Sequence, residues 1–149
     1  MTESCQDHSQ PCDVVLFIPN TRWYGKRPWI LFPNSALILT GLFKDKFSFG
    51  IIDANIADCS EEEAMAQIAK KNPKVFLVSG ISVEYYAQYH TAFSLAKKTK
   101  QAIITVFGGI YPTLLPYEAL EDKNIDYVFR GPAEGRRALK LIDCLLNVD

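Results

Sequence analysis

The chain has 149 residues, of which 48% are hydrophobic and 22% are charged, and its formal net charge is -1. This length suffices for one domain that buries roughly two thirds of its unfolded surface, whereas two domains would each have a marginal core. Because the basic residues are scattered, the sequence excludes the clustered positive charge that nucleic acid or an anionic membrane attracts.

Residues 1–12 form a polar segment at the amino terminus. They are rich in Ser, Gln and Asp, which is typical of disorder, and they lack the basic and then apolar pattern of a signal peptide. No apolar run approaches the roughly 20 residues of a membrane span. We therefore expect a disordered tail over residues 1–12, one domain over residues 13–149 and a cytoplasmic location.

Four cysteines occur along the chain without C-x-x-C spacing, which argues against a zinc ribbon or an iron–sulfur cluster. Cys5, His8 and Cys12 lie close together in the tail and carry the donor atoms of a metal site. The disorder expected of the tail favours the other interpretation, in which these residues bind no metal.

Five short apolar runs follow, each succeeded by turn residues and then a helical stretch. They are rich in β-branched and aromatic residues and do not alternate with polar ones, which indicates strands covered on both faces. Helices between successive strands predict right-handed crossovers and a parallel sheet. We predict a doubly wound α/β fold, flavodoxin-like or Rossmann-like, with five parallel strands in the order 2-1-3-4-5. The runs are Val14–Ile18, Phe47–Ile52, Val75–Val78, Ala102–Phe107 and Tyr127–Phe129.

Three of the helices have readable boundaries. Ser60-Glu61-Glu62-Glu63 has the form of a capping box, and Asn72-Pro73 ends the helix that it begins. A second helix runs from Tyr85 to Lys100, with lysines near its carboxyl end, where the helix dipole favours positive charge. A last helix is expected roughly over Ala133–Leu146.

Doubly wound sheets serve many functions, so the loops must indicate the function. The dinucleotide pattern G-x-G-x-x-G and the phosphate loop G-x-x-x-x-G-K-[ST] are both missing. The fourth run instead ends at Gly108-Gly109 and turns through prolines into a helix. Two residues without Cβ let the backbone approach a ligand closely at the carboxyl end of a strand, which is where open α/β sheets bind ligands.

The loops resemble, in their order and spacing, the corrinoid-binding domain that precedes the barrel of cobalamin-dependent radical SAM proteins. The resemblance extends from about Asp13 to Leu146. The segments that carry it are Pro33–Leu42, Ile51–Asn55, Gly80–Val83, Phe107–Thr113 with Leu115-Pro116, and Ile125–Glu134.

This resemblance implies that cobalamin is held at the carboxyl edge of the sheet, with its nucleotide tail in a slot between the first and third strands. Gly108 and Gly109 would permit close approach, and Ser79 or Ser82 would offer a hydroxyl to the tail. The alternatives are a helix cap at either serine and a tight turn at the glycine pair. The implied cofactor-binding residues are Asn20, Thr21, Ser79, Ser82, Gly108, Gly109, Tyr111, Pro112, Gly131 and Glu134.

Two departures from the family pattern affect these expectations. Other cobalamin domains have D-x-H-x-x-G after the first strand, and Arg22 stands where that cobalt-binding His would be. Arginine stays protonated and has no free lone pair, so base-off cobalamin without a protein ligand to cobalt is implied, as in the radical SAM relatives that lack this His. The closing turn reads Gly-Pro-Ala-Glu, which leaves Glu134 either as a tail contact or as an acid stabilised by a helix dipole.

No C-x3-C-x2-C triplet occurs, so a [4Fe-4S] cluster and S-adenosylmethionine would be bound only by a partner barrel, in cis or in trans. We expect no catalytic residue within the chain, which is the amino-terminal part of a longer enzyme, a truncated product or a free-standing relative. The first functional interpretation is the cobalamin module of a radical SAM enzyme, with methyl transfer as one reaction. The others are a descendant that no longer binds cobalamin and acts in docking, and another small-molecule binder on the same fold.

Overall fold

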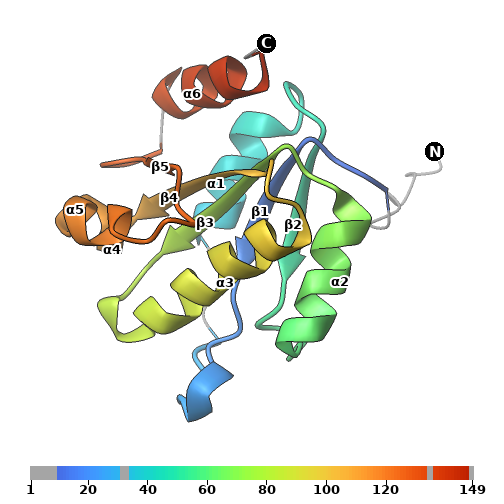
Figure 1. Cartoon of the computed structure of the whole chain (residues 1–149). Helices are drawn as coiled ribbons and strands as arrows, with labels where there is room; N and C mark the ends of the chain where they lie inside the picture. Colours follow the sequence, from blue (N-terminus) through green and yellow to red (C-terminus); the bar gives the residue numbers. More distant parts are fainter. Residues whose placement is uncertain (1–9, 31–33, 134–135, 148–149) are drawn as a thin grey trace.

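The computed structural model describes residues 10–30, 34–133 and 136–147. These residues contain one five-stranded parallel sheet in the order β2-β1-β3-β4-β5 (Figure 1). The predicted fold class and strand order are therefore confirmed. The strands are β1 (Val14–Ile18), β2 (Phe49–Asp53), β3 (Val75–Gly80), β4 (Ile104–Gly109) and β5 (Tyr127–Val128).

Helices cover both faces of the sheet, as Figure 1 shows. Alternate residues of each strand point to opposite faces, so the sheet contributes to two separate cores. Val15 and Phe17 of β1 belong to the core under α2 and α3, whereas Val14 and Leu16 belong to the core under α1 and α6. The helices are α1 (Asn34–Phe43), α2 (Glu61–Lys71), α3 (Tyr86–Thr99), α4 (Ile110–Leu114), α5 (Pro116–Leu120) and α6 (Arg136–Leu146), with single 3-10 turns at Trp23–Gly25 and Val83–Tyr85.

The predicted capping box of α2 is confirmed. The Ser60 hydroxyl accepts a hydrogen bond from the Glu63 N–H at 3.1 Å, and the Glu63 carboxylate accepts one from the Ser60 N–H at 2.8 Å. Asn72 ends the helix in the left-handed conformation, with φ of 46°. Both ends of this helix are therefore specified by residues next to it in the sequence.

Several strand boundaries differ from the predicted runs. β2 begins at Phe49 because the N–H of Phe47 donates to the Phe43 carbonyl at 2.9 Å and so belongs to the turn after α1. β3 and β4 both extend beyond their apolar runs, to Gly80 and Gly109, and these two glycines are directly paired across the strands. The carboxyl edge of the sheet is therefore built from glycine backbone at its centre.

The segment expected to be a disordered tail is partly packed. Cys12 is 7% exposed, and its N–H donates to the Lys71 carbonyl at 3.0 Å. Cys5, His8 and Glu134 lie outside the described residues. Within residues 10–30, 34–133 and 136–147, no group of His, Cys, Asp and Glu side chains is arranged to hold a metal. In the same ranges, no helix is long and apolar enough to cross a membrane.

Candidate functional site

A cavity of about 660 Å³ lies between α1 and α6, on one face of the sheet and at its carboxyl edge. We call it the α1/α6 cavity. Its volume lies within the range of small-molecule sites. Protein interiors leave few voids larger than a water molecule, so a cavity of this size is a candidate site for a ligand. Its walls include Leu16, Ile38, Leu39, Phe43, Leu77, Val106, Leu141 and Ile142, which are all apolar.

The slot predicted for the nucleotide tail between the first and third strands stays a prediction. β1 and β3 are hydrogen-bonded neighbours, with Val14–Phe17 paired to Val75–Val78, and the α1/α6 cavity is lined by Leu16 of β1 and Leu77 of β3. The cavity lies over the strands, because α1 and α6 stand apart above the sheet and leave part of its face uncovered. The cavity is thus formed by two helices and the sheet together.

Gly108 borders open space. A Cβ added at Gly108 has only Phe129 within 4 Å, at 3.9 Å, and Gly108 lines the α1/α6 cavity. The backbone here is accessible to a ligand at the place where the prediction put it. The geometry therefore favours the close-approach interpretation at Gly108.

Gly109 differs from its neighbour, although it also borders the cavity. Its φ is +100°, and an added Cβ would lie 2.6 Å from the Gly80 carbonyl oxygen and 2.7 Å from the Gly80 nitrogen. The missing side chain lets β4 approach β3 closely, so the geometry favours the tight-turn interpretation at Gly109.

The loops after β4 and β5 are joined at the rim of the cavity. The Thr113 hydroxyl donates to the Gly109 carbonyl at 2.6 Å and accepts from the Gly131 N–H at 3.0 Å. Gly131 has φ of +85° and lines the cavity together with Thr113. Sequence reasoning missed Thr113, whose role depends on two loops that are distant in the chain.

The two candidate serines differ in what their hydroxyls contact. Ser79 lines the α1/α6 cavity, and its hydroxyl has no hydrogen-bond partner in the described part of the chain. The Ser82 hydroxyl accepts from the Glu84 N–H at 3.2 Å and caps the turn Val83–Tyr85, as the capping alternative predicts. Ser79 is therefore the serine that can offer a hydroxyl to a ligand.

Asn20 and Thr21 fasten the loop after β1 to the loop after β2. Asn20 is 2% exposed, and its amide donates to Asp58 Oδ1 at 2.9 Å and to the Cys59 carbonyl at 3.1 Å. The Thr21 hydroxyl donates to Asn55 Oδ1 at 2.8 Å. Asn20 therefore does not line the α1/α6 cavity. Thr21 does not line it either, and borders a smaller cavity described below.

Arg22 is held within the same loop contacts. Its Nη1 donates to the Asn55 carbonyl at 3.1 Å and lies 3.4 Å from Asp58 Oδ1. An ion pair of this kind, partly exposed to water, contributes little to stability but positions the guanidinium. No histidine lines either cavity among the described residues.

Tyr111 and Pro112 line neither cavity. The Tyr111 hydroxyl lies 3.3 Å from His90 Nε2, and His90 Nδ1 lies 2.6 Å from Asp122 Oδ2. Both Tyr111 and Pro112 are buried. Burial also raises the pKa of the Tyr111 hydroxyl, which keeps it protonated at neutral pH. Tyr111 therefore connects α4 to α3 through His90, and neither residue gives a surface to a ligand in the α1/α6 cavity.

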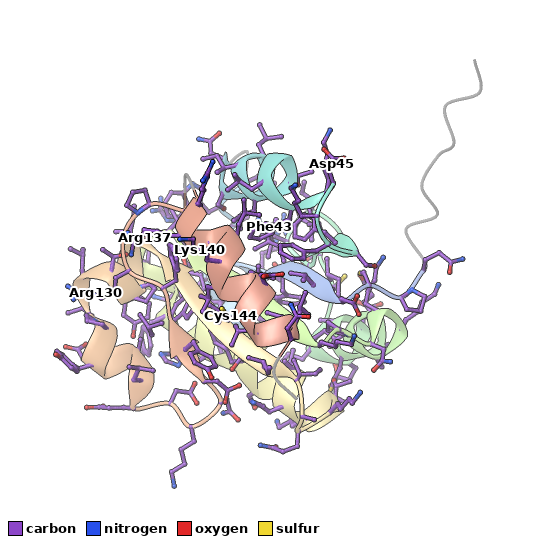
Figure 2. The ribbon with its side chains drawn as sticks, turned by 90° about the horizontal axis from the view of Figure 1, so that it is seen from above. Phe43, Asp45, Arg130, Arg137, Lys140 and Cys144 are labelled. Atoms are coloured by element: carbon purple, nitrogen blue, oxygen red, sulfur yellow. The ribbon has the colours of Figure 1, made fainter. Side chains whose placement is uncertain are left out.

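Basic side chains stand beside the cavity rim. The Arg137 guanidinium lies 5.2 Å from the centre of the Phe129 ring, and its Nη2 donates to the Arg130 carbonyl at 3.1 Å. Phe129 lines the cavity. Figure 2 shows Arg137 and Lys140 on α6, with Arg130 on the side of this helix away from Phe43 of α1. The Arg137 guanidinium therefore lies beside a residue of the cavity wall, where its positive charge would favour an anionic group.

A family model described as the B12 binding domain matches residues 25–140. The chain belongs to the B12-binding domain family. The match begins in the loop after β1 and ends within α6, so it includes α1, the loops after β3, β4 and β5, and the first residues of α6. A corrinoid is accordingly the class of ligand that this family implies.

The fold is also similar to that of a solved structure, a pilus assembly protein CpaE from Caulobacter crescentus CB15. The two chains share 15% sequence identity with a TM-score of 0.52, over 94% of this chain and 96% of that one. At this identity the likeness shows the shared fold alone. Comparison with curated proteins gives no match.

Proposed function

We propose that the chain holds cobalamin at the carboxyl edge of its sheet, with the nucleotide tail in the α1/α6 cavity. The observation that carries this placement is the cavity of about 660 Å³, which is walled by apolar side chains and bordered by Gly108 at its edge. An aromatic base attached to a polar sugar phosphate fits such a site, because the base replaces the missing apolar contacts and the phosphate reaches the rim.

Individual residues have separate roles in this proposal. Gly108 leaves space for the tail to enter, and the Ser79 hydroxyl is free to hydrogen-bond to it. Arg137 lies beside Gly131, with Nη1 3.7 Å from an added Cβ there, and is placed to pair with the tail phosphate. When bound, cobalamin supplies a cobalt centre that can carry a methyl group.

The proposed binding state is base-off, without a protein nitrogen on cobalt. Arg22 occupies the position of the usual His, and its guanidinium is already bound to Asp58 and to the Asn55 carbonyl. His90 is bound to Asp122 and Tyr111 and lines neither cavity. These contacts support a site in which the tail leaves cobalt and no imidazole of the chain takes its place.

We also propose that a radical SAM barrel, in cis or in trans, covers the bound cofactor and supplies the [4Fe-4S] cluster and S-adenosylmethionine. Exposed apolar side chains follow the carboxyl ends of the strands, and such a group of side chains is typical of a surface that a partner covers. The gene beyond the Asp149 codon, or a neighbouring gene, should then encode C-x3-C-x2-C; its absence from both would contradict the partnership. The exposed side chains are Ile30, Ile56, Ile81, Ile110 and Leu114.

The binding proposal is tested by titrating the chain with hydroxocobalamin and with cobinamide, which lacks the nucleotide tail. Absorbance spectra and calorimetry measure both affinities. We expect cobalamin to bind at least about tenfold more tightly, since only its tail fills the cavity. A chain that stays colourless after gel filtration with hydroxocobalamin would instead be a family member that has lost its ligand.

A matched pair of variants on α1 tests the placement of the tail. Ile38, which is 38% exposed, lines the α1/α6 cavity, whereas the adjacent Leu37, which is 59% exposed, does not line it. Ile38→Trp should fill the cavity and remove the preference for cobalamin over cobinamide, while Leu37→Trp should keep it. If both variants bind cobalamin as the wild type does, the tail lies elsewhere.

A further inference from the structure

Gln88 is a fully buried polar residue in α3, with 0% exposure. Its Nε2 donates to the Thr21 carbonyl at 3.1 Å and to the Trp23 carbonyl at 2.9 Å. These two acceptors fix the orientation of the amide, because the reversed orientation would place Oε1 against two carbonyl oxygens. Oε1 therefore faces away from the loop that Nε2 holds.

The Oε1 atom of Gln88 has no hydrogen-bond partner among the described residues. A buried acceptor without a partner is unfavourable, because folding removes its hydrogen bonds to water and provides no other donor. Native proteins rarely keep such a group unless water or a ligand satisfies it. The orientation of the Gln88 amide thus indicates a missing hydrogen-bond donor.

Gln88 lines a second cavity of about 60 Å³, which we call the switch cavity and which Thr21, Ser79 and Tyr89 also line. It lies at the carboxyl ends of β1 and β3, where the strand order reverses. Open α/β sheets bind ligands at this position. Its volume is several times the minimum that one water molecule requires.

Tyr89 provides a second unused group at the switch cavity. Its hydroxyl oxygen accepts the N–H of Ile81 at 3.0 Å and that of Ser82 at 3.2 Å. The hydroxyl hydrogen has no acceptor within residues 10–30, 34–133 and 136–147. Burial raises the pKa of Tyr89, so the hydroxyl keeps this hydrogen at neutral pH. Gln88 and Tyr89 both line the cavity, so one unused acceptor and one unused donor belong to residues of its wall.

We infer that the switch cavity is a binding site for a primary carboxamide of the corrin ring. The amide N–H donates to Gln88 Oε1, and the amide carbonyl accepts from the Tyr89 hydroxyl. The corrin rim carries acetamide and propionamide groups, and Ser79 borders both cavities, so a ligand in the α1/α6 cavity is adjacent to this one. This inference rests on the proposed function.

The test compares two rings that both lack the nucleotide tail. Dicyanocobinamide carries primary amides, whereas dicyano heptamethyl cobyrinate carries methyl esters, which cannot donate a hydrogen bond. We expect the wild-type chain to bind the amide ring at least roughly tenfold more tightly, as two hydrogen bonds in a buried site imply. This comparison does not depend on the folding of any variant.

A second comparison uses the variant Gln88→Met, and urea unfolding verifies that this variant is folded. It should weaken binding of the amide ring and leave the ester ring unchanged, so that the preference disappears. Equal binding of the two rings by the wild type, or an equal loss for both in the variant, would overturn the inference and leave the cavity to water. If neither ring binds and hydroxocobalamin does not bind either, the proposed function fails as well.

Discussion

Replacing the two adjacent glycines by alanine, one at a time, should have unequal effects on the stability of the chain: only the substitution at Gly109 should destabilise it. At Gly108 an added Cβ meets only Phe129, at 3.9 Å, and the residue lies within β4. Gly108→Ala should therefore leave the free energy of unfolding unchanged or raise it by about 0.4–1 kcal/mol, since alanine restricts the unfolded chain.

Gly109→Ala should destabilise the chain strongly. Its φ of +100° is unfavourable for alanine, which costs about 1–3 kcal/mol. The added Cβ lies 2.6 Å from the Gly80 carbonyl oxygen, and relieving a backbone contact of this kind costs about 1–3 kcal/mol more. A loss of at least about 2 kcal/mol is a large share of the roughly 5–15 kcal/mol that stabilises a domain.

Urea unfolding followed by tryptophan fluorescence measures both effects, because Trp23 and Trp29 pack against the core under α2 and α3. The midpoint of Gly109→Ala should fall by roughly 1 M, and that of Gly108→Ala should not fall. Equal destabilisation by the two substitutions would refute the assignment of Gly109 to strand packing and of Gly108 to the ligand. For binding, Gly108→Val should weaken cobalamin at least about tenfold, with Gly108→Ala as the smaller control.

Three further predictions follow from the site and the fold. Cobalamin bound in its Co(II) form should show no nitrogen superhyperfine splitting in its electron paramagnetic resonance spectrum. Its absorbance should also change little between pH 5 and 8, because no imidazole with a pKa near 6.5 is bound to cobalt. An axial nitrogen signal would contradict the base-off state. Arg137→Ala should weaken cobalamin about three- to tenfold and leave cobinamide unaffected, since cobinamide lacks the tail phosphate; calorimetry distinguishes this from an equal loss for both ligands. Ser60→Ala should lower the free energy of unfolding by about 1 kcal/mol through the lost cap of α2, without changing cobalamin affinity.

The strands and their order could be predicted because each depends on neighbours in the sequence. Continuous apolar runs, the capping box at Ser60 and the helices between strands are all local signals. The distinction between Gly108 and Gly109 is not local. It depends on the approach of β4 to Gly80, which lies on another strand and has no counterpart in the spacing of the glycines.

The walls of the α1/α6 cavity could not be predicted for a related reason. Apolar residues at helical spacing, such as Leu39 and Leu141, look the same whether they face a filled core or a cavity. Gln88 did give a signal, since it is a polar residue within the buried stripe of α3 beside Tyr89 and Ala92. The direction of its amide, however, depends on carbonyls in the loop after β1.

The short attachment of β5 has a consequence for how a ligand enters and leaves. In the described part of the chain, β5 pairs with β4 through Tyr127 and Val128, and the Phe129 N–H donates to the Phe107 carbonyl at 2.9 Å. The Thr113 hydroxyl joins the loops beyond them. The wall formed by α6 is therefore fastened less extensively than the opposite wall, which continues into the fully paired strands β1 and β2. Transient opening should occur on the α6 side first, and amide hydrogen exchange should be faster in β5 than in β4. The dissociation rate of the cofactor would then depend on how often the α6 wall opens. A ligand that contacts both walls would hold this wall closed and so dissociate more slowly.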